Sequence, residues 1–193
     1  MKRRFFSACL ALALLAALGF TGPVTAEEQV PFKGRLVGSF TAMPVDPSNP
    51  LVVAVQLNAT GNATHLGAFT YDFPHIVNRS VMPSLAVGSS TFTAANGDKV
   101  FANVIGQASP VAPGVLYVVE RATITGGTGR FASASGEFVI ERLINQISLT
   151  TMGSFEGTIS SPGAGNPQSK KRRTMKTTAI HRQLLHIFPG RNL

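Results

Sequence analysis

Three acidic side chains are the best candidates for acid–base chemistry in this 193-residue chain: Asp46, Asp72 and Glu120. Carboxylates often serve as general acids and bases in enzymes. A lone carboxylate on a strand is usually solvated on the outer face, and we expect that placement for these three. Glu120 and the arginine after it alternate to opposite faces of a strand, as do the residues of the Glu-Arg step at 141–142. Neither step therefore predicts an ion pair.

Metal and nucleophilic chemistry find little support in the central part of the chain. His65 and His75 are its histidines, whereas zinc needs three or four ligands. There is no His-x-His spacing, no cysteine after Cys9 and no G-x-S-x-G nucleophile elbow. The sequence therefore predicts no metal site and no cofactor, and its catalytic residues, if it has any, are unknown.

The first 26 residues resemble a secretory signal peptide. Three basic residues at 2–4 precede an apolar run over 5–20, and the small residues at 24–26 suit a cleavage site after Ala26. The alternative is a membrane anchor, but the run is short for a span of about 20 residues. We expect cleavage and a secreted or periplasmic protein.

The net charge of +8 belongs to the two ends of the chain. Of the 17 basic residues, three lie in the signal segment and seven lie in the tail, 162–193, while all nine acidic residues lie in 27–162. The central region is therefore near −2, and no nucleic-acid contact by this region is predicted. The tail is expected to be disordered, with weak contact to an anionic surface as the alternative.

The region 27–161 is predicted to be an all-β domain. Short runs rich in Val, Ile, Phe and Thr recur between turn residues, for example around Asn96-Gly97-Asp98. In 65–73, the residues His65, Phe69, Tyr71 and Phe73 share one face. The expected strands are 32–41, 51–59, 64–73, 84–94, 99–108, 115–125, 137–145 and 148–159.

The connections favour an antiparallel arrangement, because no helical spacers separate the strands. Three prolines make 44–50 a predicted loop, since proline lacks a backbone donor, and Asn145-Gln146 is predicted to link the last two strands. About eight strands in succession suit an up-and-down barrel, which has no free edges, and a sandwich is the alternative.

The stretch "ITGGTGRFASASGEF" at 124–138 holds four glycines next to Phe131. Glycine reaches backbone angles that are closed to other residues, so we predict a strand end and a tight reversal with at least one positive φ at 126–129. Phe131 is predicted to plug the end of the barrel. Phosphate binding is the alternative, but it would require a helix start after the glycines, and the residues that follow are strand formers.

The same stretch resembles the G-G-[ST]-G-x-F-x-x-A-x-G signature of allene oxide cyclases and dirigent proteins. "TTMGSFEGTI", "STFTAANGDKVFANVIG" and "ATHLGAFT" extend the resemblance over most of 58–160, toward the bacterial allene-oxide-cyclase-like barrel domain. The resemblance implies an eight-stranded antiparallel barrel, often trimeric, with an apolar cavity. It also implies an acidic group and a held water inside the barrel for the cyclases, but the first strand, 32–41, has no carboxylate.

Two functions follow as expectations. The first is an exported small β-barrel that binds a small apolar ligand or acts as a non-catalytic interaction module. The alternative, implied by the resemblance alone, is an isomerase that acts on an unsaturated fatty-acid epoxide. Allene oxide cyclases steer such an epoxide into a ring, whereas dirigent proteins orient the coupling of phenoxy radicals. Whether the protein is an enzyme is left open, and a homotrimer is the oligomer that the resemblance implies.

Overall fold

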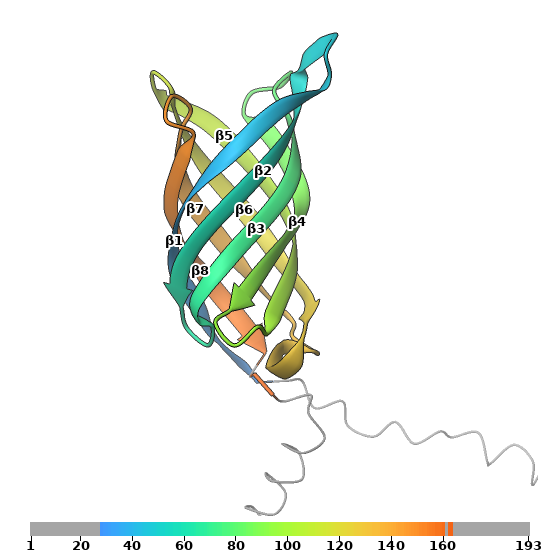
Figure 1. Cartoon of the computed structure of the whole chain (residues 1–193), viewed down its shortest axis with the longest axis vertical. Helices are drawn as coiled ribbons and strands as arrows, with labels where there is room; N and C mark the ends of the chain where they lie inside the picture. The colour runs from blue at the N-terminus through green and yellow to red at the C-terminus, as the bar shows by residue number, and fades with distance from the viewer. Residues whose placement is uncertain (1–27, 161, 164–193) are drawn as a thin grey trace, which may run out of the picture.

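Eight antiparallel strands form a closed barrel in the computed structural model, which describes residues 28–160, 162 and 163 (Figure 1). Each strand pairs with the next along the chain, and β8 pairs back with β1. The predicted fold class is confirmed, and the sandwich alternative is excluded. The strands are β1 (Gln29–Asp46), β2 (Asn49–Ala63), β3 (Gly67–Asn78), β4 (Ser84–Ala94), β5 (Lys99–Ala112), β6 (Val115–Gly127), β7 (Gly136–Asn145) and β8 (Thr150–Ser160).

The two ends of the sequence fall outside the described residues. The predicted signal segment, 1–26, and the tail beyond residue 163 are among them. Across the part of the chain that the structure describes, no helix is long and apolar enough to cross a membrane.

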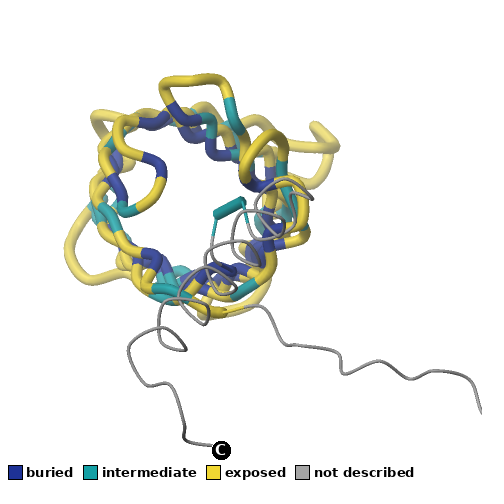
Figure 2. Tube along the Cα trace, turned by 90° about the horizontal axis from the view of Figure 1, so that it is seen from below, coloured by how far each residue is buried: buried dark blue, intermediate teal, exposed yellow. Residues whose placement is uncertain are grey.

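Alternation along each strand separates the barrel interior from its outer wall, as Figure 2 shows in the view from below. Val100, Ala102 and Val104 of β5 are buried, while the residues between them are exposed. Phe69, Tyr71 and Phe73 of β3 also point inward. His65 does not join that face, because β3 begins only at Gly67 and His65 lies in the preceding turn with a φ of 63°.

Aromatic side chains fill the half of the barrel that lies near the chain ends. Five phenyl rings pack there with neighbouring centroids 5.0 to 6.1 Å apart, mostly edge to face or tilted. Each such ring contributes about 1.5–3 kcal/mol through burial. This half of the interior is therefore solid, and it anchors the fold. The rings are those of Phe32, Phe69, Phe92, Phe138 and Phe155.

The glycine-rich stretch closes the base of the barrel. Gly126 and Gly129 have φ values of 137° and 56°, which confirms the prediction of at least one positive φ at 126–129. The chain then forms a single 3-10 turn, Gly129–Phe131, and places Phe131 in the core at 1% exposure. The longer helix that a phosphate site would need is absent from this described turn.

Two connections differ from the prediction. The proline-rich segment is not a loop, because β1 runs through Asp46 and Pro44 pairs with Val53 of β2. Proline is tolerated there because β1 has lost its β8 neighbour beyond Phe40, so one edge of the strand is open. The last hairpin uses residues 146–149 rather than a two-residue link, and Leu149 supplies a φ of 55°.

Candidate functional site

The end of the barrel opposite Phe131 is the one that remains open. This end carries the loops drawn at the top of Figure 1. A cavity of about 60 Å³ enters the interior there. Its walls are mostly aliphatic, with Phe40, Leu57 and Val118 among them, and Arg79 and Gln146 also border it. His75, Glu120 and Arg142 are the polar side chains that reach it from deeper in the barrel.

A buried ion pair between Glu120 and Arg142 lies at the inner end of this cavity. The Nη2 atom of Arg142 donates to Oε1 of Glu120 at 2.6 Å, and its Nε atom donates to Oε2 at 2.9 Å. The two side chains are 0% and 3% exposed. The Thr151 hydroxyl accepts a longer bond of 3.5 Å from Arg142 and donates to the Leu143 carbonyl. Such two-pronged contacts are the strongest geometry available to this pair of groups.

The expectation of a solvated carboxylate is wrong for Glu120 and agrees with the structure for Asp46 and Asp72. Both aspartates are exposed, and Asp72 accepts a hydrogen bond from Gln56 at 2.7 Å on the outer wall. Glu120 occupies an inward position of β6, and its partner comes from β7 rather than from the next residue. The sequence does indicate that Glu120 points inward, because the residues two positions before and after it, Val118 and Ala122, are apolar.

Three glycines leave room for the polar side chains inside the narrow barrel. Gly88, Gly106 and Gly153 stand directly across from His75, Glu120 and Arg142 on neighbouring strands. A Cβ atom at Gly106 would meet the Cγ atom of Glu120, and one at Gly153 would meet the Cβ atom of Arg142. The missing side chains therefore position the polar groups in the interior.

His75 packs flat against Phe73, with ring centroids 4.1 Å apart, and is 7% exposed. Its Nδ1 lies 2.9 Å from the Phe73 carbonyl, which can only accept, so Nδ1 carries the proton and Nε2 remains an acceptor when the ring is neutral. Burial lowers the pKa of His75, while the Phe73 carbonyl and Glu120 act in the opposite direction. The ring is therefore neutral at ordinary pH.

The titration of His75 predicts a loss of stability in mild acid. The pKa of His75 is lower in the folded protein than in the unfolded chain, where it has its ordinary value of 6.5. As the pH falls toward and below 6.5, the unfolded chain therefore binds more protons than the folded protein does. The free energy of unfolding is therefore expected to fall as the pH drops from about 7.5 to about 5.5. Urea titrations at each pH would measure this. His75→Gln should flatten the dependence, whereas the exposed His65→Gln should retain it; equal curves for both variants would contradict the assignment.

Two further hydroxyl groups are buried without a hydrogen-bond partner among the described residues. They belong to Tyr71 and Ser90, which are 2% and 1% exposed. Burial, and then the negative charge of Glu120, raise the pKa of Tyr71, so its hydroxyl stays protonated. Unsatisfied buried hydroxyls are rare, and neither residue is among those that line the cavity. They make the middle of the barrel more polar than its base.

Two basic groups line the cavity, and they differ in availability. The carboxylate of Glu120 is held on both oxygens by Arg142, whereas Nε2 of the neutral His75 ring is left as an acceptor. Within the described residues no group of three or more His, Cys, Asp and Glu side chains could hold a metal ion. The apolar walls can take up an apolar group, and Nε2 of His75 can accept one hydrogen bond.

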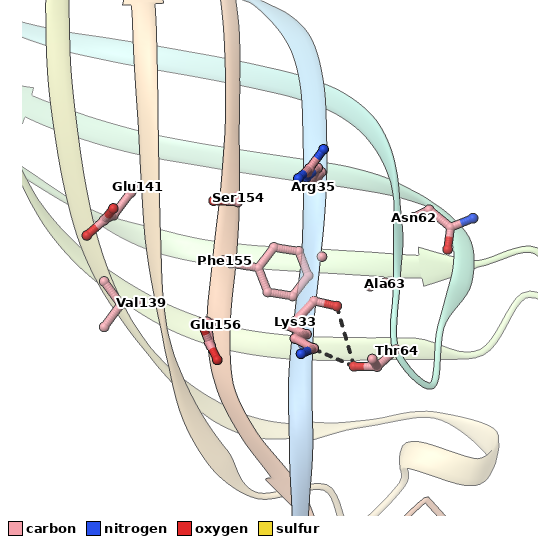
Figure 3. A pocket seen from close by; sticks show the side chains of 11 residues that line it. Lys33, Arg35, Asn62, Ala63, Thr64, Val139, Glu141, Ser154, Phe155 and Glu156 are labelled. Carbon is pink, nitrogen blue, oxygen red and sulfur yellow. Dashed lines mark hydrogen bonds between the residues drawn. The ribbon is translucent and has the colours of Figure 1, made fainter.

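A larger hollow, of about 600 Å³, lies on the outer wall (Figure 3). Lys33 and Arg35 of β1 lie there between Glu156 of β8 and Thr64, which follows the end of β2. Lys33 stands directly opposite Glu156, and its backbone bonds to the Thr64 hydroxyl. Charges of both signs and the open surface make this hollow a poor site for an apolar ligand, despite its volume.

Comparisons with known proteins assign no function to this chain. No family model and no curated protein matches the chain. Among solved structures, the chain is similar to the pterocarpan synthase dirigent protein GePTS1, at 11% identity and a TM-score of 0.48. That match covers 70% of this chain and 92% of the other. The resemblance to allene oxide cyclases stays a prediction.

Proposed function

We propose that the barrel binds a small, largely apolar ligand through its open end. The observation that carries the proposal is the contrast between the two halves of the interior. The base is filled by phenyl rings and capped by Phe131, whereas the open end keeps a cavity with aliphatic walls. Leu116 and Ile144 are only half-buried there, so a ligand that covers them removes apolar surface from water.

The cavity volume restricts the ligand to slim molecules. Drug-sized ligands occupy pockets of about 300–1,000 Å³, against about 60 Å³ here. A ligand therefore inserts one narrow apolar end, and the half-buried ring of Phe40 is the side chain best placed to turn aside. A hydroxyl or N–H group at the inserted end would donate to Nε2 of His75, which supports a ligand with one donor group.

The ligand would be encountered outside the cytoplasm. This part of the proposal is supported by the basic and apolar pattern of residues 1–26. The intact mass of protein recovered from the periplasm or the medium is expected to correspond to a chain that starts at Glu27. A mass that retains Met1 would contradict cleavage and would favour an anchor.

Ligand binding can be tested by thermal unfolding with a panel of slim alcohols, phenols and hydrocarbons. A ligand at about 100 times its Kd stabilises the folded state by about 2.7 kcal/mol, which is a shift of several degrees in Tm for a domain of this size. Ala108→Leu places a larger side chain in the cavity and should abolish the shift. Ala68→Leu makes the same change on the outer wall and should preserve it. No shift with any ligand, or equal shifts in both variants, would count against the proposal.

An isomerase acting on an unsaturated fatty-acid epoxide is the second candidate. It is favoured by one observation, the carboxylate of Glu120 inside the barrel, since the resemblance implies an acidic group there. Incubation with an unstable allene oxide tests it. A single enantiomer of the cyclic product, lost in Glu120→Gln, would support the isomerase, and racemic product at the uncatalysed rate would reject it.

A further inference from the structure

Large apolar side chains are exposed on every connection at the open end of the barrel. With the strand ends beside them, these connections are 43–51, 79–83, 110–114 and 145–149, and they lie together at the top of Figure 1. We call their exposed apolar residues the apolar rim: Met43, Val45, Leu51, Val81, Met82, Val111, Ile147 and Leu149, each at least 43% exposed. The three connections at the base, all within the described residues, expose no large apolar side chain. Of the two ends, only the open one is therefore apolar on its surface.

The four segments that carry the apolar rim have almost no charge. They contain one acidic residue, Asp46, and one basic residue, Arg79. Oδ1 of Asp46 already accepts hydrogen bonds from the backbone N–H and the hydroxyl of Ser48, at 2.8 and 2.7 Å. Arg79, which also borders the cavity, takes part in neither of the two ion pairs of the described residues. The rim therefore complements a surface that is mostly apolar and offers a negative group to Arg79.

The backbone of these segments is suited to leave water. Six of the chain's 12 prolines lie in them: Pro44, Pro47, Pro50, Pro83, Pro110 and Pro113. Proline has no backbone N–H group to remove from water. Other N–H groups are already bonded within the loops, since Oδ1 of Asn49 accepts from Leu51 at 3.2 Å and Oδ1 of Asn145 accepts from Ile147 at 2.9 Å. Bonded groups cost less to transfer to an apolar medium, so these loops can enter one.

We propose that the apolar rim docks onto the surface of a lipid membrane, with the open end of the barrel facing the lipid. The rim residues lie on four separate connections around the mouth of the cavity. A stable protein partner needs a continuous, closely packed contact of about 800 Å². Fluid lipid instead closes around separate side chains, and its phosphates supply the negative group that Arg79 lacks.

Docking in this orientation places the cavity next to the lipid. This consequence rests on the proposed function, because a slim apolar ligand can then pass from the lipid into the barrel without crossing water. The docking itself needs no ligand, since it depends on the rim alone. The two proposals can therefore fail separately, and each has its own test.

Vesicle flotation without added ligand tests the docking. The native chain is expected to float with phosphatidylcholine vesicles. Met82→Ser with Ile147→Ser removes rim side chains that are 69% and 83% exposed, and should lower the vesicle partition coefficient by about tenfold or more. Val37→Ser with Ile105→Ser makes the same kind of change on the outer wall, at 57% and 65% exposure, and should retain the native partition coefficient.

A variant that fills the cavity separates docking from ligand binding. Ala108→Leu, which should abolish ligand binding, is expected to leave flotation unchanged. A native chain that does not float would overturn the docking and would assign the rim to a protein partner. Equal losses in the two serine pairs would overturn it as well. So would a loss of flotation in Ala108→Leu, because the cavity rather than the rim would then hold the lipid.

The orientation can be measured with a single fluorescent reporter, because the chain contains no tryptophan. Phosphatidylcholine with brominated acyl chains should quench the fluorescence of Ile147→Trp and leave that of Val37→Trp largely unquenched. Equal quenching at the two positions would place the wall rather than the open end against the lipid, and would overturn the proposal. Circular dichroism would confirm that every variant remains folded.

Discussion

Arg142→Met is expected to destabilise the barrel by about 3–5 kcal/mol, the usual cost of leaving a buried charge without its partner. The carboxylate of Glu120 is fully buried and takes both of its side-chain hydrogen bonds from Arg142. Methionine occupies the space of the arginine stem but donates nothing. The free energy of unfolding, from urea titration at neutral pH, measures the effect.

The double variant separates the loss of the pair from the loss of packing. Glu120→Leu with Arg142→Met replaces both charges with apolar groups, and such replacements are often neutral or stabilising. We therefore expect it to recover most of the stability lost in Arg142→Met, and Thr151 keeps its bond to the Leu143 carbonyl in both variants. Glu141→Gln, on the outer wall, should change stability by less than about 0.5 kcal/mol. A double variant as unstable as the single one would contradict the account.

The architecture was accessible from the sequence because its signals are local. Period-two alternation in 99–106 separates inward from outward residues without knowledge of any neighbour, and Asn96-Gly97 marks a turn by its own chemistry. Eight such segments without helical spacers left few arrangements other than the barrel that the structure has. The local rule that proline interrupts a strand failed at Pro44. There β1 continues as a strand because β8 no longer pairs with its other edge.

The interior site depended on relations that no local pattern contains. Glu120 and Arg142 lie 22 residues apart and meet only because β6 and β7 pair in one particular register. Inspection of adjacent residues pointed to Arg121 and Glu141, which do face outward, and so missed the pair. An acidic and a basic residue that each interrupt an inward apolar face were the available clue. No such clue predicts that the hydroxyls of Tyr71 and Ser90 lack hydrogen-bond partners, because this depends on how the side chains are oriented inside the barrel.

Phe131→Ala is expected to cost about 3–5 kcal/mol, since truncating a buried ring removes its transfer free energy and leaves a cavity. Phe131 is 1% exposed, and its turn is tied to the β4–β5 connection. The Thr128 hydroxyl accepts from the Lys99 N–H at 2.9 Å, and Arg130 lies 3.7 Å from Asp98. The turn that carries Phe131 is therefore held in place by these contacts. It cannot easily collapse into the space that the ring would leave.

Two companion variants distinguish the ring from the rest of the turn. Arg130→Ala removes a partly exposed ion pair and should cost less than about 1 kcal/mol. Gly129→Ala forces a side chain onto a backbone with a φ of 56° and against Asp98, so it should cost about 1 kcal/mol or more. Thermal and urea unfolding would rank the three. Because the cavity lies at the opposite end, a ligand that raises the Tm of the native protein should raise that of Phe131→Ala as well. If Phe131→Ala instead left the Tm unchanged and eliminated ligand binding, Phe131 would belong to a binding site and the base would not be a plug.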